Sequence, residues 1–444
     1  RYRPRRRSLA QLVAATLAVV VLAGATSFAV AQMMDQDETP ITVVEATPDT
    51  TAPPPLTLEE TQIEVPVDRL FGTALDRGDT GRSGFVDVEG PRRVDGYYWI
   101  FPTADAITST PIAFGNNLLV GGTDSVFRAI DLTSGESVWN LTTEAQIATS
   151  PALGVASLGE GQNPGLVVVV GDDGFVRARD AVIVTQSLAW PPVRLGAPIR
   201  SAPIVEDGRA YVASRDGVVH AIDLASGSEV WRYPAAEDER LGGITAGLAL
   251  HDGIIYVGTE AGTLHLINID GTLHCEANVD GPITVNPIVV GDTAYISTGF
   301  FVNLLPAGAC EVPITEVVPF LSESVVDVAP AVVGDLMYVP NQQFLNAIDL
   351  TKVGTAVGSP DEVHHWSPGK VNADAKISTP PVVTRDAVYF GTESGRVYAV
   401  DADTGDVLWE WQTGNFVLAS PVVIEGAVYI ASGDGSIYAV GPAG

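Results

Sequence analysis

The stretch ASPVVIEGAVYIASGDGSIYAV, residues 419–440, decides the fold that we expect for this chain. It holds three short runs of β-branched, aromatic and small apolar residues, which are separated by Gly426 and by Asp434-Gly435. Runs of this length between turn residues are typical of β-strands. Asp-Gly favours a tight hairpin because its backbone must reach positive φ. The stretch therefore predicts three consecutive antiparallel strands.

The same phrase recurs along most of the chain. Its Ser-x-Pro opening, its Tyr run and its closing alternating run return at 378–401 and at 201–223. The copies are spaced by about 44 residues on average, which is the repeat length of four-stranded propeller blades. Marked by Pro, or by Leu248 where Pro is replaced, the eight copies lie at Pro111, Pro151, Pro203, Leu248, Pro287, Pro330, Pro380 and Pro421.

A second motif, Ala-x-Asp-x-x-Thr/Ser-Gly-x-x-x-Trp, places a tryptophan on the expected fourth strand. It occurs at 129–139, 221–231 and 399–409, and ends in Trp139, Trp231 and Trp409. Trp99 lies twelve residues before Pro111, the same distance that separates Trp139 and Trp409 from the next Pro. A large flat ring at a fixed repeat position suits packing between neighbouring sheets. We expect all four tryptophans to dock adjacent blades.

The ends of the repeat array predict how the ring closes. Residues 96–101 form a fourth strand with no unit before it, whereas the last unit ends after three strands. The N-terminal strand can complete the C-terminal blade, which removes the exposed sheet edges. We therefore expect residues 95–444 to form an all-β, eight-bladed propeller of four-stranded antiparallel blades.

The first ninety residues differ in composition. We expect residues 1–8 to be a basic cytoplasmic stub and the uncharged run 9–31 to be a transmembrane anchor or a signal segment. Residues 32–94 have the acidic, Thr- and Pro-rich composition of a linker. Basic residues before the span place the propeller on the extracytoplasmic side, tethered to the cell membrane by a single pass, or secreted if cleavage follows Ala31.

The charge of the chain excludes one class of partner. It carries 54 acidic residues against 24 Lys and Arg, and five of those basic residues lie in the first seven positions. Such a field repels phosphate backbones, so we expect no nucleic-acid partner. The six histidines show no spacing typical of a metal site. We therefore expect no catalytic, cofactor-binding or metal-ligating residues.

Two cysteines occupy related repeat positions. Cys275 lies four residues after Gly271, where other blades carry the docking tryptophan, and Cys310 lies on the matching strand of the next blade. An extracytoplasmic location permits oxidation. Either the two residues form a disulfide between neighbouring blades, or they remain unpaired thiols buried in their sheets.

Two hairpins depart from the repeat sequence, although the strands that they connect follow it. Where most blades carry Asp-Gly or Gly between the second and third strands, one carries Phe300-Phe301 and the next carries Gln342-Gln343-Phe344. We expect an exposed apolar patch rimmed by amides, which commonly marks a protein interface. The alternative is that these rings pack against their own sheet edges. The insertion at 351–376, which contains Trp366, is expected to be a solvated loop.

The repeat and the tryptophan motif resemble the pyrroloquinoline-quinone-type, or quinoprotein-like, β-propeller repeat family. For the quinone-dependent dehydrogenases of that family, the resemblance implies a catalytic Asp, a calcium site and often adjacent cysteines, none of which stands out here. Its non-catalytic branch includes the propeller subunit of the outer-membrane β-barrel assembly machinery. We therefore expect a protein-binding scaffold in the cell envelope and no enzyme. The alternatives are the ligand-sensing ectodomain of a receptor or kinase, which the sequence before Arg1 would decide, and a quinone-dependent dehydrogenase.

Overall fold

The computed structural model describes residues 72–74, 77–155, 165–181, 187–236, 239–279, 281–299, 301–310, 315–317, 326–353, 360–424 and 426–443. The chain divides into two compact units, Arg1–Leu58 and Glu59–Gly444, and every described residue belongs to the second. The expected anchor or signal segment at 9–31 lies outside the described residues. Among the residues in these ranges, no helix has both the length and the apolar character needed to cross a bilayer.

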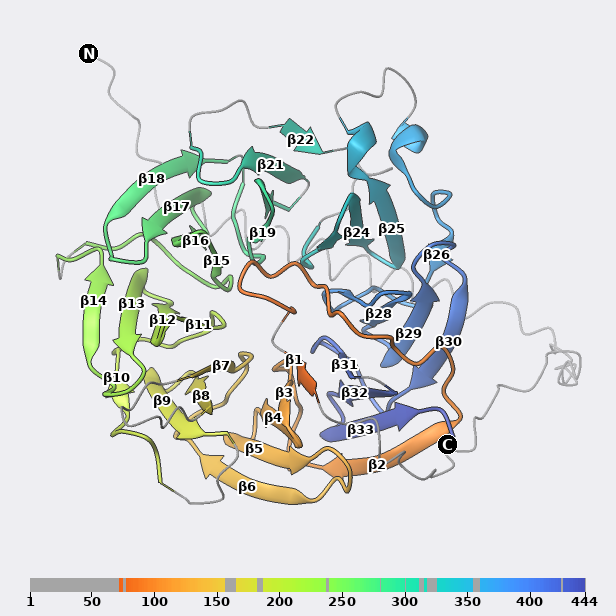
Figure 1. Ribbon diagram of the computed structural model, residues 1–444, viewed down its shortest axis with the longest axis horizontal. Helices are drawn as coiled ribbons and strands as arrows, with labels where there is room; N and C mark the ends of the chain where they lie inside the picture. Colours follow the sequence, from red (N-terminus) through yellow and green to blue (C-terminus); the bar gives the residue numbers. More distant parts are fainter. Residues whose placement is uncertain are drawn as a thin grey trace, which may run out of the picture. The chain divides into compact units, whose positions relative to one another are not determined.

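The second unit consists of eight antiparallel sheets, which Figure 1 shows arranged around a common centre. Blade 1 contains β3 (Ile112–Gly115), β4 (Asn117–Gly121), β5 (Val126–Asp131) and β6 (Ser137–Thr142), and blade 2 contains β7 (Ala152–Val155), β8 (Gly165–Val170), β9 (Phe175–Asp180) and β10 (Val193–Arg194). Blade 3 contains β11 (Ile204–Glu206), β12 (Arg209–Ser214), β13 (Val218–Asp223) and β14 (Glu229–Tyr233), and blade 4 contains β15 (Ala249–His251), β16 (Ile254–Gly258), β17 (Thr263–Asn268) and β18 (Leu273–Asn278).

Blades 5 to 8 complete the ring and include the two short 3-10 helices of the structure. Blade 5 contains β19 (Ile288–Val290), β20 (Thr293–Ser297), β21 (Val302–Pro306) and β22 (Thr315–Val317), and blade 6 contains β23 (Ala331–Val333), β24 (Leu336–Asn341), β25 (Phe344–Asp349), η1 (Leu350–Lys352), η2 (Pro360–Val363) and β26 (Val371–Asn372). Blade 7 contains β27 (Val382–Val383), β28 (Ala387–Gly391), β29 (Arg396–Asp401) and β30 (Val407–Gln412), and blade 8 contains β31 (Val422–Ile424), β32 (Ala427–Ala431), β33 (Ser436–Gly441) and β2 (Gly96–Pro102).

The hydrophobic core lies between the blades, in eight layers that each join two neighbouring sheets. In one layer, Ile204 and Tyr211 of blade 3 pack with Leu248 and Ile255 of blade 4. The second strands are buried on both faces, which explains their continuous apolar runs; all five residues of β4 are buried. A single blade cannot cover its own apolar faces, so its stability depends on both neighbours.

The ring closes as the sequence predicts. Strand β2 pairs antiparallel with β33, with Ile100 opposite Tyr438 and Pro102 opposite Ser436. The expected eight-bladed, four-stranded antiparallel propeller is therefore confirmed. One sheet has an additional member, because β1 (Gly72–Ala74) pairs with β3 at the inner edge of blade 1.

The ring has two faces, which we call the link face and the strap face. On the link face, the hairpin between the second and third strands of a blade receives the connection from the preceding blade, as when Ala104 N donates to Asp124 Oδ2 over 3.3 Å. On the strap face, the other two turns of a blade meet, as when Leu224 N donates to Gly208 O over 2.8 Å.

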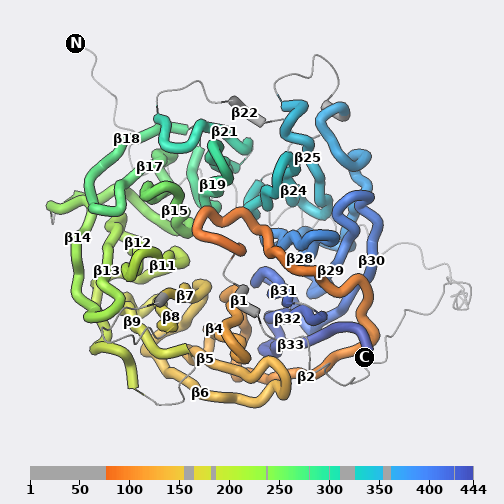
Figure 2. The backbone as a smooth tube through the Cα atoms, viewed as in Figure 1, coloured from red at the N-terminus to blue at the C-terminus, as the bar shows by residue number. Residues whose placement is uncertain are grey.

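Residues 77–95, which we call the strap, fall within the range expected to be linker, and the structure places them against the ring. Figure 2 shows the strap crossing from the outer edge, near the C-terminus, to the centre. At the outer edge, Asp95 N donates to Gly441 O over 3.0 Å. N-terminal to the strap, Gly72 of β1 pairs with Gly115 in the strap-face turn of blade 1.

Candidate partner-binding surface and axial site

The tryptophans expected to dock the blades do so through one repeated hydrogen bond. The indole Nε1 of Trp99 donates to Leu132 O over 2.9 Å, and that of Trp231 donates to Ile269 O over 3.0 Å. Each acceptor lies in the strap-face turn of the next blade. The ring itself covers the glycine of that turn: a Cβ on Gly135 would lie 2.5 Å from Trp99 Cγ, and its φ is +70°. This contact explains why the motif contains glycine.

The last blade lacks this turn, because its outer strand is β2 and does not follow β33 in the chain, and the strap supplies the acceptor in its place. Trp409 Nε1 donates to Pro91 O over 2.7 Å, and Tyr389 Oη donates to the same oxygen over 3.2 Å. The strap therefore completes the docking contact between blades 7 and 8.

Trp139 is the exception among the four predicted positions. It is 5% exposed, yet its Nε1 has no hydrogen-bond partner among the described residues. The carbonyl of the corresponding turn residue, Ala181, accepts from Asn117 Nδ2 over 3.0 Å. The guanidinium of Arg179 lies 4.0 Å from the Trp139 ring centroid, within the range of a cation–π contact.

Sequence reasoning missed two docking tryptophans. Trp190 Nε1 donates to Leu224 O over 3.0 Å, and Trp366 Nε1 donates to Ala402 O over 3.1 Å. Both side chains are buried, so Trp366 does not belong to a solvated loop as expected. Neither residue ends a complete Ala-x-Asp-x-x-Thr/Ser-Gly-x-x-x-Trp motif, and their connections to the next Pro contain one or two extra residues, which broke the twelve-residue spacing that identified Trp99. A sequence pattern that allows a variable number of residues between the tryptophan and the next Pro would predict both.

At the junction of blades 4 and 5, the structure joins Cys275 and Cys310 in a disulfide, with Cα atoms 6.2 Å apart. Cys275 occupies the tryptophan position of blade 4, opposite Leu266. The neighbouring turn is held by Tyr256, whose Oη accepts from Gly308 N over 2.8 Å. A covalent bond therefore replaces the indole contact at this junction.

The link-face hairpins of blades 5 and 6 are the predicted partner patch. Gln342 and Gln343 are exposed, whereas the described rings, Phe301 and Phe344, are partly buried. Phe300 lies outside the described residues. The backbone of the hairpin also holds the connection to blade 7, because Gln343 O accepts from Ala373 N over 2.8 Å. The amides therefore form the accessible part of this surface.

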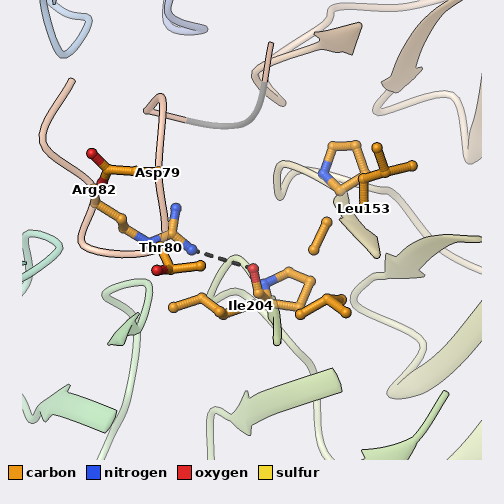
Figure 3. Close-up of a pocket in the computed structure, with 9 residues that line it drawn as sticks. Asp79, Thr80, Arg82, Leu153 and Ile204 are labelled. Carbon is orange, nitrogen blue, oxygen red and sulfur yellow. Dashed lines mark hydrogen bonds between the residues drawn. The ribbon is translucent and has the colours of Figure 1, made fainter. Parts of the chain in front are cut away.

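The axial end of the strap carries two buried arginines. Arg82 donates to Leu248 O, and its Nη2 donates to Ala202 O over 3.0 Å and to Pro203 O over 3.3 Å. Figure 3 shows Arg82 directed toward the inner strand that begins at Ile204. Arg77 donates to Pro330 O and, over 3.1 Å, to Arg82 O. The carbonyl acceptors from the ring lie at the start of the inner strands of blades 3, 4 and 6. The strap is therefore fixed at the axis by charge-assisted hydrogen bonds.

Two buried histidines each contact a carboxylate. His220 Nδ1 lies 2.6 Å from Glu229 Oε1, and His265 Nδ1 lies 3.0 Å from Glu276 Oε1. Burial lowers the pKa of both imidazoles even though the carboxylates oppose the shift, which favours the neutral form.

These histidines occupy one register position of the repeat, which indicates a structural polar layer. Each lies on the third strand of its blade, opposite the same position of the second strand: Val212 for His220 and Val257 for His265. Within the described ranges, no group of three or more His, Cys, Asp or Glu is arranged to hold a metal ion. The equivalent residues in other blades are Arg128, Arg177, Asn303, Asn346, Tyr398 and Tyr438.

Comparison with known proteins identifies related chains. A family model described as outer membrane protein assembly factor BamB matches residues 123–294 and 352–443. The BamB of Salmonella typhimurium is 23% identical over 225 residues, which cover 48% of this chain and 56% of that protein. The 1-butanol dehydrogenase (cytochrome c) of Thauera butanivorans is 34% identical over 114 residues, or 23% of this chain and 16% of the enzyme.

A solved structure agrees with the fold. The crystal structure of BamB from Moraxella catarrhalis superposes with a TM-score of 0.56 at 17% sequence identity and covers 78% of this chain and 99% of that one. At this identity the likeness concerns the fold alone. The chain spans about half the length of the Salmonella relative and a smaller part of the dehydrogenase.

Proposed function

Because this chain belongs to the outer membrane protein assembly factor BamB family, we propose that it is a non-enzymatic, protein-binding scaffold of the cell envelope. Residues 9–31 tether it to the membrane, and the propeller lies on the extracytoplasmic side. The partner is a protein and binds the link face at the patch formed by Phe300, Phe301, Gln342, Gln343 and Phe344.

The observation that carries this proposal is the asymmetry between the two faces of the ring. The strap covers part of one face and enters the axis, where its arginines are bonded to ring carbonyls. Strand β1 also pairs with β3 at the strap-face turn of blade 1, with Gly72 opposite Gly115. Among the described residues, the link-face hairpins make none of these contacts, so they remain available to a partner.

The charge of the ring indicates the chemistry of the partner. The chain has a formal charge of −30, and the first seven residues contribute five of its positive charges. An acidic surface favours approach by a protein with a basic binding face, and that attraction weakens as salt is added. We therefore expect binding to the scaffold to become weaker with increasing ionic strength.

Affinity capture from the envelope of the native cell tests the proposal. The bait is the full chain, and the patch variant combines Phe300→Ser, Phe301→Ser and Phe344→Ser. Leu273→Ser is the matched control, because Leu273 is 42% exposed and lies on the outer strand of blade 4, away from the patch. We expect the patch variant alone to lose the partner. Equal capture by all baits with intact folding would contradict the patch.

The dehydrogenase alternative has support from the partial similarity to 1-butanol dehydrogenase. The occupied axis favours the scaffold over this alternative. Binding of pyrroloquinoline quinone with calcium, followed by absorbance, discriminates the two functions. For the receptor alternative, the discriminating observation is a signalling domain in the sequence before Arg1.

A further inference from the structure

The axial end of the strap is a pre-shaped turn. Gly84 N donates to Arg77 O over 2.9 Å, and Arg82 N donates to Asp79 O over 3.1 Å. The carboxylate of Asp79 accepts from Ser83 N over 3.0 Å and from Ser83 Oγ over 2.6 Å. These bonds all join residues of the strap itself and favour one conformation of the turn, which reduces the entropy lost when the turn binds.

The ring binds the strap backbone as it would bind an added strand. Four successive blades each donate one inner-strand N–H to a strap carbonyl, at distances from 2.7 to 2.9 Å. The strap also returns one bond, from Val86 N to Val383 O over 2.8 Å. Backbone bonds of this kind give affinity, as in other cases of peptide addition to a sheet edge. The four donors and acceptors are Leu250 to Thr80, Val289 to Gly81, Val332 to Ser83 and Val383 to Gly84.

The side chains of the strap add selectivity to these backbone bonds. A Cβ on Gly81 would lie 2.2 Å from Val289 O, so only glycine permits this approach. The two guanidiniums fill the axis and donate to carbonyls of three blades. Lysine lacks the planar fork that reaches several carbonyls at once. The site therefore selects arginine and glycine at defined places.

Little room remains beside the strap. The cavity between the strap and blades 2 and 3 offers about 40 Å³ to the centres of water-sized molecules, and the cavity toward blades 7, 8 and 1 offers about 10 Å³. A single water needs roughly 10–15 Å³ on this measure, so the cavities hold about three waters and one water. A planar tricyclic quinone does not fit in either space.

We propose that the axial opening of this ring is a peptide-binding site, specific for an extended segment that bears arginine and glycine, and that the strap is its resident ligand. The strap clamps blades 3 to 7 together from the axis. It also closes the axis to a quinone, because its turn and its two guanidiniums occupy the space beside the inner strands of blades 3, 4 and 6.

Hydrogen–deuterium exchange on the full chain tests the clamp. We expect the amides of Leu250, Val289 and Val332 to be protected in the wild type and to exchange at least about tenfold faster in Arg82→Met. Arg93→Met is the matched control, since Arg93 belongs to the strap but its side chain is 71% exposed. If Arg82→Met does not fold, Arg82→Lys gives the same readout. Fast exchange in the wild type, or equal protection in all variants, would overturn the clamp.

Quinone titration tests the second half of the proposal independently. Pyrroloquinoline quinone and calcium are added to the wild type, and equilibrium dialysis measures how much quinone the protein retains. Hydrogen–deuterium exchange of the amides bonded to the strap is followed in parallel. We expect no stoichiometric retention. One quinone retained per chain would overturn the closed axis, whether or not the amides stay protected. Retention of the quinone would count against the scaffold as well. The exchange experiment does not bear on capture at the link face, so failure of the clamp is distinguishable from failure of the scaffold.

Discussion

Removal of one indole N–H at a time tests whether the tryptophan hydrogen bonds hold the blades together. The perturbation is Trp→Phe at Trp99, Trp231 or Trp139. The first two donate to the next blade over 2.9 and 3.0 Å, whereas Trp139 has no acceptor among the described residues. Trp139 is therefore a matched control, because it has the same repeat position and a similar ring contact with a neighbouring aromatic residue.

The structure sets the size of the effect. Every Trp→Phe change loses the second ring, a packing cost shared by all three variants. Trp99 and Trp231 also lose a hydrogen bond, which contributes about 0.5–1.5 kcal/mol net. The carbonyls that lose the indole donor each keep a second one: Tyr429 Oη donates to Leu132 O, and Arg209 Nη1 donates to Ile269 O, both over 3.3 Å. The full free-energy penalty of an unsatisfied buried acceptor therefore does not apply. We expect Trp99→Phe and Trp231→Phe to be less stable than Trp139→Phe by about 1 kcal/mol.

Urea unfolding followed by circular dichroism measures the difference as a shift in midpoint at constant slope. Circular dichroism is preferred to fluorescence because the substitutions change the tryptophan signal itself. A loss of stability in Trp139→Phe equal to that in the other two variants would refute the hydrogen-bond account and leave ring packing as the source of docking. A change in slope would mean that the blades no longer unfold together.

Three further predictions concern the closure of the ring, the strap and the disulfide. Deletion of Ser436–Gly441 removes the partner of β2 and should abolish cooperative unfolding of all eight blades; a soluble, cooperatively folded product would contradict closure. A hydrogen bond from Arg92 lowers the pKa of Asp401 to about 2 from its usual 3.8, so this pair stabilises the ring above about pH 4 and is lost as the pH falls toward 2. In Asp401→Asn, the midpoint of urea unfolding should therefore depend less on pH between pH 2 and 5 than in the wild type. The same pH dependence in both proteins would argue against a stabilising Arg92–Asp401 pair. The Cys275–Cys310 disulfide joins residues 35 apart in the sequence, so its reduction should lower the free energy of unfolding by up to about 4 kcal/mol. Urea unfolding with and without reductant measures this difference. A thiol assay on the unreduced protein should detect no free cysteine.

The features that the sequence revealed were those encoded by repetition. The unit marked by Pro, or by Leu248 in one copy, recurs once per blade, so its spacing gave the number of blades, and the orphan strand around Trp99 gave the closure. The register argument also placed Cys275 where other blades carry tryptophan, and the structure joins it to Cys310. Each of these inferences compared a position with its equivalents in other blades.

The strap escaped prediction because it has no equivalent elsewhere in the chain. Its composition, with Gly, Pro and charged residues, is that of a linker, and its binding uses backbone groups that leave no periodic pattern. The acceptors of Arg82 lie more than a hundred residues away in sequence. Trp366 was missed for a related reason, since the lengthened connection after it hid a position that the packing preserves.

Photo-cross-linking in the native cell tests the central claim, that the link face binds a protein partner, most directly. A photoreactive residue replaces Gln343, which is exposed on the link-face hairpin of blade 6, and in a second strain replaces Glu136, which is exposed on the strap face of blade 1. We predict that only the residue at 343 yields a cross-link to an envelope protein, and that added salt reduces the yield. Cross-linking to the same protein from position 136 but not from 343 would contradict the account.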